Sequence, residues 1–160
     1  MKNITFFIVA MLALLAVSLY FNAKYFSMKE DTQSLLLDTK EVNAIHKVMD
    51  NQLEAWNNGN HEGFMEGYWN SDALRFISTK GVTTGWKNTL NMYKERYNTK
   101  EKMGKLIFHK DGIYNMSEKD REVLLVGRWE VHKKDTAMGS FALLFKNING
   151  DWKIIEDRTY

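Results

Sequence analysis

Apolar side chains recur at α-helical spacing between residues 42 and 56. The stripe, whose members are three or four positions apart, consists of Val42, Ile45, Met49, Leu53 and Trp56. Asp38, followed three residues later by Glu41, predicts a capping box in which each side chain bonds a backbone N–H at the helix start. Gly59 predicts the end of this helix, and Asn60 predicts the cap of a second, short helix that ends near Gly67.

The pattern changes to strand alternation after the two helices. In residues 72–78 the apolar Leu74 and Phe76 alternate with the polar Arg75, which predicts a strand. Residues 79–81, which end in Gly81, predict a turn into a second short strand at 82–84. A third helix is expected to begin at Thr84 or Gly85 and to end at Asn98. Its apolar stripe consists of Trp86, Leu90, Tyr93 and Tyr97. Four later runs predict an antiparallel meander, and they cover residues 105–114, 122–132, 137–146 and 151–158.

Several of the later strands are apolar on both faces. In the run 122–132, Val123 and Leu125 lie on one face, while Leu124 and Val126 lie on the other. A sheet with one solvated face would show polar residues at every second position. We therefore expect helices to cover the concave face and a second copy of the chain to cover the convex face, which predicts a homodimer.

Composition narrows the classes of function. The chain contains 5 Trp, 7 Tyr and 9 Phe, so we expect an aromatic interior or a cavity lined by rings. The net charge of +2 falls to +1 without residues 1–31, which hold three lysines and two acidic residues, and no basic run remains to bind nucleic acid. The absence of cysteine excludes disulfides, thiol nucleophiles and thiolate metal sites.

An apolar segment precedes the predicted domain. Residues 4–21 carry no charge and follow Lys2, which is typical of a signal peptide or a membrane anchor. The small residues 16–18 favour cleavage. An uncleaved interfacial anchor is favoured by the aromatic residues Tyr20, Phe21, Tyr25 and Phe26. Both alternatives predict that residues 1–31 export a domain formed by residues 32–160. If the segment is not cleaved, residues 4–21 are the only part of the chain expected to contact a membrane.

The order of the predicted elements resembles the cone-shaped α+β fold of the nuclear transport factor 2-like (NTF2-like) superfamily, which includes ketosteroid isomerases and SnoaL-type polyketide cyclases. Seven blocks look more closely like a bacterial branch whose members are mostly of unknown function: AWNNGNHEGFMEGYW (55–69), GVTTGW (81–86), MYKERY (92–97), MGKL (103–106), VGRW (126–129), GSFALLFK (139–146) and DWKIIEDR (151–158). The resemblance implies a curved antiparallel sheet wrapped around three helices, with a pocket at the open end of the cone.

Aromatic residues are the candidates for lining that pocket. They are Trp56, Tyr68, Trp69, Phe76, Trp86, Tyr93, Trp129 and Phe141. Such a lining would hold an unknown flat, apolar or aromatic small molecule. The alternative for any one ring is ordinary core packing.

Ketosteroid isomerase chemistry requires a carboxylate base, a tyrosine and a carboxylic acid that stays protonated. The resemblance places these groups near Phe76 or Ile77, near Gln52, and near Phe141 or Ala142. None of these residues has the required chemistry, which argues against that reaction.

The remaining polar candidates are near the end of the chain. The resemblance implies Asp-His at the end of the last strand, but here Arg158 follows Asp157, and arginine does not shuttle protons near neutral pH. Arg158 is expected either to bind a carboxylate or phosphate of a ligand, or to pair with Glu156 at the surface. An enzyme would use Asp157 with Tyr68 or His109 as its acid–base pair.

Neither a metal nor a cofactor is predicted. The four histidines are scattered without ligand spacing, and glycine-rich phosphate loops and serine-nucleophile motifs are missing. The first hypothesis is therefore an exported small-molecule-binding domain in which Asp157 and Arg158 orient the ligand. The alternatives are a SnoaL-like or isomerase-like enzyme, and an interaction domain whose cone is filled by side chains.

Overall fold

The computed structural model describes residues 15, 18–24, 37–117 and 119–160. It divides into two units, Met1–Leu36 and Leu37–Tyr160, and the second contains the fold described below. Most of the predicted apolar segment, residues 4–21, lies outside the described residues. Among the residues that are described, no helix is both long enough and apolar enough to cross a membrane. Export of the domain stays a prediction.

Helix α2 (Thr39–Asn57) is the long helix predicted from the apolar stripe. The Asp38 side chain caps it by accepting a hydrogen bond from the Lys40 backbone N–H at 3.1 Å. The reciprocal half of the predicted capping box is wrong, because the Glu41 carboxylate instead accepts a hydrogen bond from Arg121 at 2.9 Å. The cap is therefore one-sided, and Glu41 ties the helix start to the sheet.

The predicted turn between the first two helices is confirmed. Gly59 has a φ of 77°, a backbone conformation in which a residue with a Cβ would be strained. Asn60 then caps α3 (His61–Met65), and its side chain accepts a hydrogen bond from the Gly63 backbone N–H at 2.8 Å. Two helices thus follow each other with only three residues between them.

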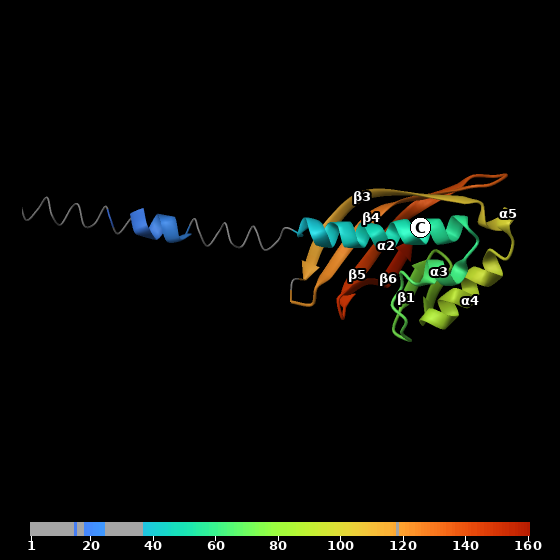
Figure 1. The fold of residues 1–160 in the computed structure, drawn as a ribbon, viewed down its shortest axis with the longest axis horizontal. Coiled ribbons are helices and arrows are strands. Elements are labelled where there is room, and N and C mark those ends of the chain that lie inside the picture. The colour runs from blue at the N-terminus through green and yellow to red at the C-terminus, as the bar shows by residue number, and fades with distance from the viewer. Residues whose placement is uncertain (1–14, 16–17, 25–36, 118) are drawn as a thin grey trace, which may run out of the picture. The chain divides into compact units, whose positions relative to one another are not determined.

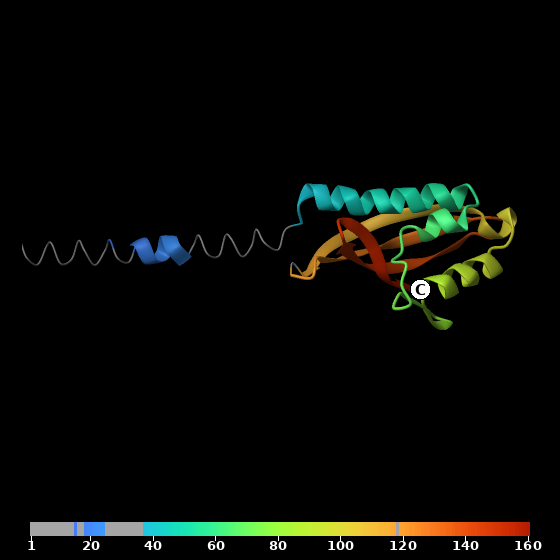
Figure 2. The ribbon, with the colours of Figure 1, turned by 60° about the horizontal axis from the view of Figure 1, so that its bottom comes forward.

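The third predicted helix is α4 (Trp86–Arg96), and it is followed by a short helix that the sequence analysis missed, α5 (Lys100–Met103). Thr99 caps α5 by accepting a hydrogen bond from the Lys102 backbone N–H at 3.3 Å. Helices α3, α4 and α5 gather near the C-terminal end of α2 (Figures 1 and 2).

Six strands form one curved, unclosed sheet in the order β2-β1-β6-β5-β4-β3. They are β1 (Arg75–Ser78), β2 (Gly81–Thr84), β3 (Lys105–Ser117), β4 (Glu122–His132), β5 (Ala137–Ile148) and β6 (Asp151–Thr159). The prediction of a wholly antiparallel sheet is wrong, because β1 pairs with β6 in parallel. These two strands are not joined by a hairpin, so the long connection between them permits a parallel pair.

The helices and one face of the sheet enclose the core. Along β5, Phe141, Leu143 and Phe145 are buried, while Met138 on the opposite face is 70% exposed. Successive side chains of a strand point to opposite faces, so these residues show which face of β5 is turned to the core. The outer face also carries apolar residues, such as Leu144, and the homodimer predicted from them stays a prediction.

Strand β6 contains one irregularity that matters for the site. Glu156 pairs with Leu144 and Ile154 pairs with Phe145, so Ile155 has no partner in the register and forms a bulge. Before the bulge Ile154 faces the core, and after it the buried residue is Asp157. Strict alternation would instead have turned position 156 inward.

Truncation of single side chains on β5 tests which face of the strand is turned to the core. Phe145→Ala should lower the free energy of unfolding by about 3–5 kcal/mol, because it empties a fully buried site. Met138→Ala on the same strand should change it by less than about 0.5 kcal/mol. Both values can be measured by chemical denaturation, and equal losses would contradict the assignment of faces.

Candidate functional site

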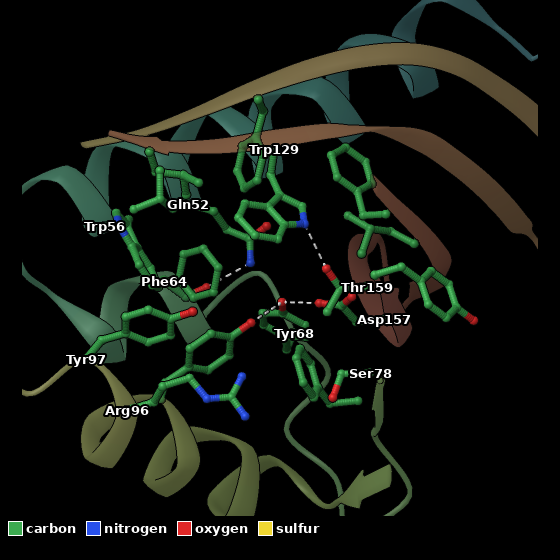
Figure 3. A pocket seen from close by; sticks show the side chains of 18 of the residues that line it. Gln52, Trp56, Phe64, Tyr68, Ser78, Arg96, Tyr97, Trp129, Asp157 and Thr159 are labelled. Carbon is green, nitrogen blue, oxygen red and sulfur yellow. Dashed lines mark hydrogen bonds between the residues drawn. The ribbon is translucent and has the colours of Figure 1, made fainter. Parts of the chain in front are cut away.

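A partly open cavity of about 200 Å³ lies between the helices and the inner face of the sheet. Apolar and aromatic side chains form most of its wall (Figure 3). Seven of the sequence-predicted residues line it: Trp56, Tyr68, Phe76, Tyr93, Trp129, Phe141 and Asp157. The cone is therefore not filled by side chains.

The aromatic rings on the helix side pack edge to face. The Trp56 ring lies 5.2 Å from Phe64 and 4.8 Å from Tyr97, measured between centroids, and both pairs are T-shaped. Tyr93 makes similar contacts with Phe64 and Phe76. Such contacts hold the rings in fixed orientations, so the wall of the cavity is preformed.

A carboxyl group interrupts this apolar wall. Asp157 is 5% exposed, and its Oδ2 accepts a hydrogen bond from the Tyr68 hydroxyl at 2.6 Å. Its Oδ1 is buried and has no hydrogen-bond partner among the described residues. Since buried polar atoms in native proteins are nearly always paired, the free oxygen requires an explanation.

Two neighbouring strands and a short bridge position this pair. The bulge at Ile155 turns Asp157 inward, where it lies between Phe76 on β1 and Leu143 on β5 in the register. Tyr68 is held against β6 because Ile154 bonds both to Gly67 and to Trp69 through the backbone, each at 2.9 Å. The site is thus built on main-chain pairing rather than on a free loop.

Burial controls the protonation of these groups. Loss of hydration raises the pKa of Asp157 to about 7, and the hydrogen bond from Tyr68 opposes this rise only in part. Burial, followed by the charge of Asp157, raises the pKa of Tyr68 and Tyr93 well above the ordinary tyrosine value. Both hydroxyls therefore stay protonated near neutral pH.

The two tyrosines and Asp157 form a chain of hydroxyl contacts. The hydroxyl oxygens of Tyr68 and Tyr93 are 3.4 Å apart. Because the single hydrogen of Tyr68 is directed to Asp157, Tyr93 is the donor to Tyr68 when Asp157 is ionised. The chain stabilises the carboxylate at Oδ2 and leaves the buried Oδ1 without a partner among the described residues.

Four sequence-predicted residues lie outside the cavity lining. Trp86 donates its indole N–H to the Met65 carbonyl at 2.9 Å, and Trp69 contributes backbone pairing to β6. Arg158 lies on the outer face, because the bulge at Ile155 shifts the alternation so that position 157 rather than 158 faces inward.

Each of the outward side chains has a partner there. Arg158 bonds Glu156 at 2.6 Å, which is the surface pair expected as the alternative to ligand binding. His109 lies on the outer face of β3 and bonds Glu130 at 2.9 Å. The structure therefore pairs Asp157 with Tyr68 and does not bring His109 to it.

The sequence analysis missed several residues of the wall, among them Gln52 and Arg96. Gln52 is 2% exposed and donates to the Phe64 carbonyl at 2.9 Å. Its spacing from Met49 and Trp56 places it on the apolar stripe, and a polar residue in such a stripe is a signal of a buried polar contact. In the part of the chain that the structure describes, no cluster of acidic, histidine or cysteine side chains could hold a metal ion.

The fold and the cavity define an α+β cone protein, and comparison with solved structures assigns its family. An NTF-2 like protein of unknown function from Shewanella oneidensis is 35% identical, with 74% of this chain and 98% of that chain covered and a TM-score of 0.69. The chain therefore belongs to the NTF2-like superfamily. No protein-family model matches the sequence, and no curated protein matches it either.

More distant neighbours share the fold alone. A domain of unknown function with a cystatin-like fold from Nostoc punctiforme is 19% identical, with coverage of 77% and 78% and a TM-score of 0.64. A ketosteroid isomerase-like protein from Erwinia carotovora is 12% identical, with coverage of 76% and 96% and a TM-score of 0.59.

The raised pKa of Asp157 predicts a pH-dependent stability. The native carboxyl keeps its proton up to about pH 7, whereas the unfolded chain loses it near pH 4, so the native state binds more protons between these values. The free energy of unfolding of the wild type should fall across this range relative to Asp157→Asn, by on the order of 4 kcal/mol. Chemical denaturation at about pH 4.5 and about pH 7.5, near the two ends of this range, measures the difference.

Tyr68→Phe provides the matched comparison. Removing the hydroxyl takes away the group that stabilises the carboxylate, so the pKa of Asp157 should rise further and the loss of stability should extend to higher pH. Identical pH dependence in the wild type and in Asp157→Asn would show that the carboxyl is not buried in the native state.

Proposed function

We propose that the cavity binds a compact, largely apolar molecule that donates a hydrogen bond to Oδ1 of Asp157. The observation that carries this proposal is the buried oxygen without a partner in a residue of the cavity wall. A ligand donor would satisfy it, and the aromatic wall would bury the rest of the molecule.

The size of the cavity limits the ligand. An apolar cavity of about 150 Å³ accommodates benzene, so about 200 Å³ accommodates one ring with small substituents. The four fused rings of a steroid exceed this space. The proposed ligand is therefore a single-ring molecule with a hydroxyl or an N–H group.

Phenol and toluene test the hydrogen bond, because they are similar in size and differ at one group. The wild type should bind phenol more tightly than toluene in calorimetric titrations. Asp157→Leu should weaken phenol binding by about fivefold, the equivalent of one hydrogen bond of about 1 kcal/mol, and leave toluene binding unchanged or stronger.

Glu156→Gln is the control, because Glu156 neighbours Asp157 in the chain but pairs with Arg75 and Arg158 outside the cavity. It should leave the binding of both probes unchanged. Equal affinity of the wild type for phenol and toluene would refute the role of Asp157, and no binding of either probe would refute the binding function.

Proton transfer is a second candidate function, favoured by the pKa of about 7 at Asp157. A carboxyl with this pKa exchanges a proton readily at neutral pH. Within the cavity it could remove a proton from the α-carbon of a β,γ-unsaturated ketone, forming a dienolate, and return that proton to the γ-carbon. The net reaction is the shift of a double bond into conjugation, and it consumes no other reactant.

Cyclohex-3-enone is a probe of suitable size for this candidate. Its conversion to cyclohex-2-enone should be accelerated by the wild type, with a rate that rises with pH to a plateau above about 7, because the carboxylate is the base. Asp157→Asn should lower the rate at least about a hundredfold. An unchanged rate in that variant would exclude catalysis by Asp157.

A further inference from the structure

Arg96 is a cation in the wall of the cavity. Arg96 lies in the last turn of α4 and lines the cavity, and its side chain is half-buried. Among the described residues it forms neither a salt bridge nor a side-chain hydrogen bond, and Figure 3 marks no hydrogen bond from its guanidinium group to the other side chains drawn. The last turn of a helix favours a positive charge, which suits the guanidinium group of Arg96.

The lining of the cavity supplies little negative charge to neutralise Arg96. The only acidic side chain that lines the cavity in the described part of the chain is Asp157, whose hydrogen bond goes to Tyr68. The second cation of the lining, Lys80, is exposed and has no salt bridge among the described residues. The cavity thus combines an apolar wall with two cationic side chains and one carboxyl group, and neither cation forms a salt bridge among the described residues.

We propose that the ligand is a ring-containing carboxylate whose anionic group binds Arg96 while its hydrogen-bond donor reaches Asp157. This rests on the proposed binding function and adds the chemical class of the ligand. The planar guanidinium group binds a carboxylate through two parallel hydrogen bonds, and partial burial strengthens them relative to an exposed pair.

The charges also determine the orientation of the bound ligand. A carboxylate placed beside Asp157 would meet a second acidic group in an apolar environment, which is unfavourable. The anion is therefore disfavoured beside Asp157 and attracted to Arg96. A hydroxyl on the far side of the ring then lies at the end where Oδ1 is unpaired.

Two probes test this class of ligand: 4-hydroxybenzoate and its uncharged counterpart, 4-hydroxybenzyl alcohol. The wild type should bind the carboxylate about tenfold more tightly, and increasing salt should reduce this preference. Arg96→Gln should abolish the preference and leave the affinity for the alcohol unchanged. Arg96→Lys should keep part of it, because the charge remains while the planar fork is lost.

Lys94→Gln is the matched control, because it removes the same charge from the same helix. Lys94 pairs with Glu62 and does not line the cavity, so this variant should keep the preference for the carboxylate. An equal loss in Lys94→Gln and Arg96→Gln, or equal binding of both probes by the wild type, would overturn the proposal for Arg96. Binding of the alcohol would then still support the proposed function, whereas binding of neither probe would refute both.

Discussion

The site depends on keeping one carboxyl group in an aromatic interior. Water no longer stabilises the charge of Asp157, and a single hydrogen bond from Tyr68 replaces only part of that stabilisation, so the pKa rises to about 7. An apolar residue of the same size would give a more stable domain. The carboxyl therefore lowers stability at neutral pH, and its buried Oδ1 has no hydrogen-bond partner among the described residues.

Main-chain geometry, rather than side-chain packing, delivers the carboxyl to the cavity. The bulge at Ile155 reverses the alternation of β6, so Asp157 faces inward and its neighbours Glu156 and Arg158 pair with each other on the outer face. The backbone bridge to Ile154 then sets Tyr68 opposite Asp157. One extra residue in β6 thus places the buried carboxyl of Asp157 and the surface ion pairs of Glu156 on opposite faces of the sheet.

Helices α2, α3 and α4 and the strands were predictable because they follow from local periodicity and capping, as at Asn60 and Gly59. Most of the aromatic wall was implied by the family resemblance. The pairing of Asp157 with Tyr68 was one of two alternatives, and only the sheet register decides between Tyr68 and His109. The outward direction of Arg158 could not be predicted, because a bulge has no signature in alternation alone. Arg96 was missed because a cation without a partner is recognised only after its neighbours are placed.

The most direct test of this account is a carbon-13 NMR titration of the Asp157 carboxyl, assigned by comparison with Asp157→Asn, without ligand and with saturating phenol. The account predicts a midpoint near pH 7 in the free protein and a lower midpoint with phenol, because the ligand hydroxyl stabilises the carboxylate at Oδ1. A midpoint near that of an ordinary exposed aspartate, unchanged by phenol, would contradict it.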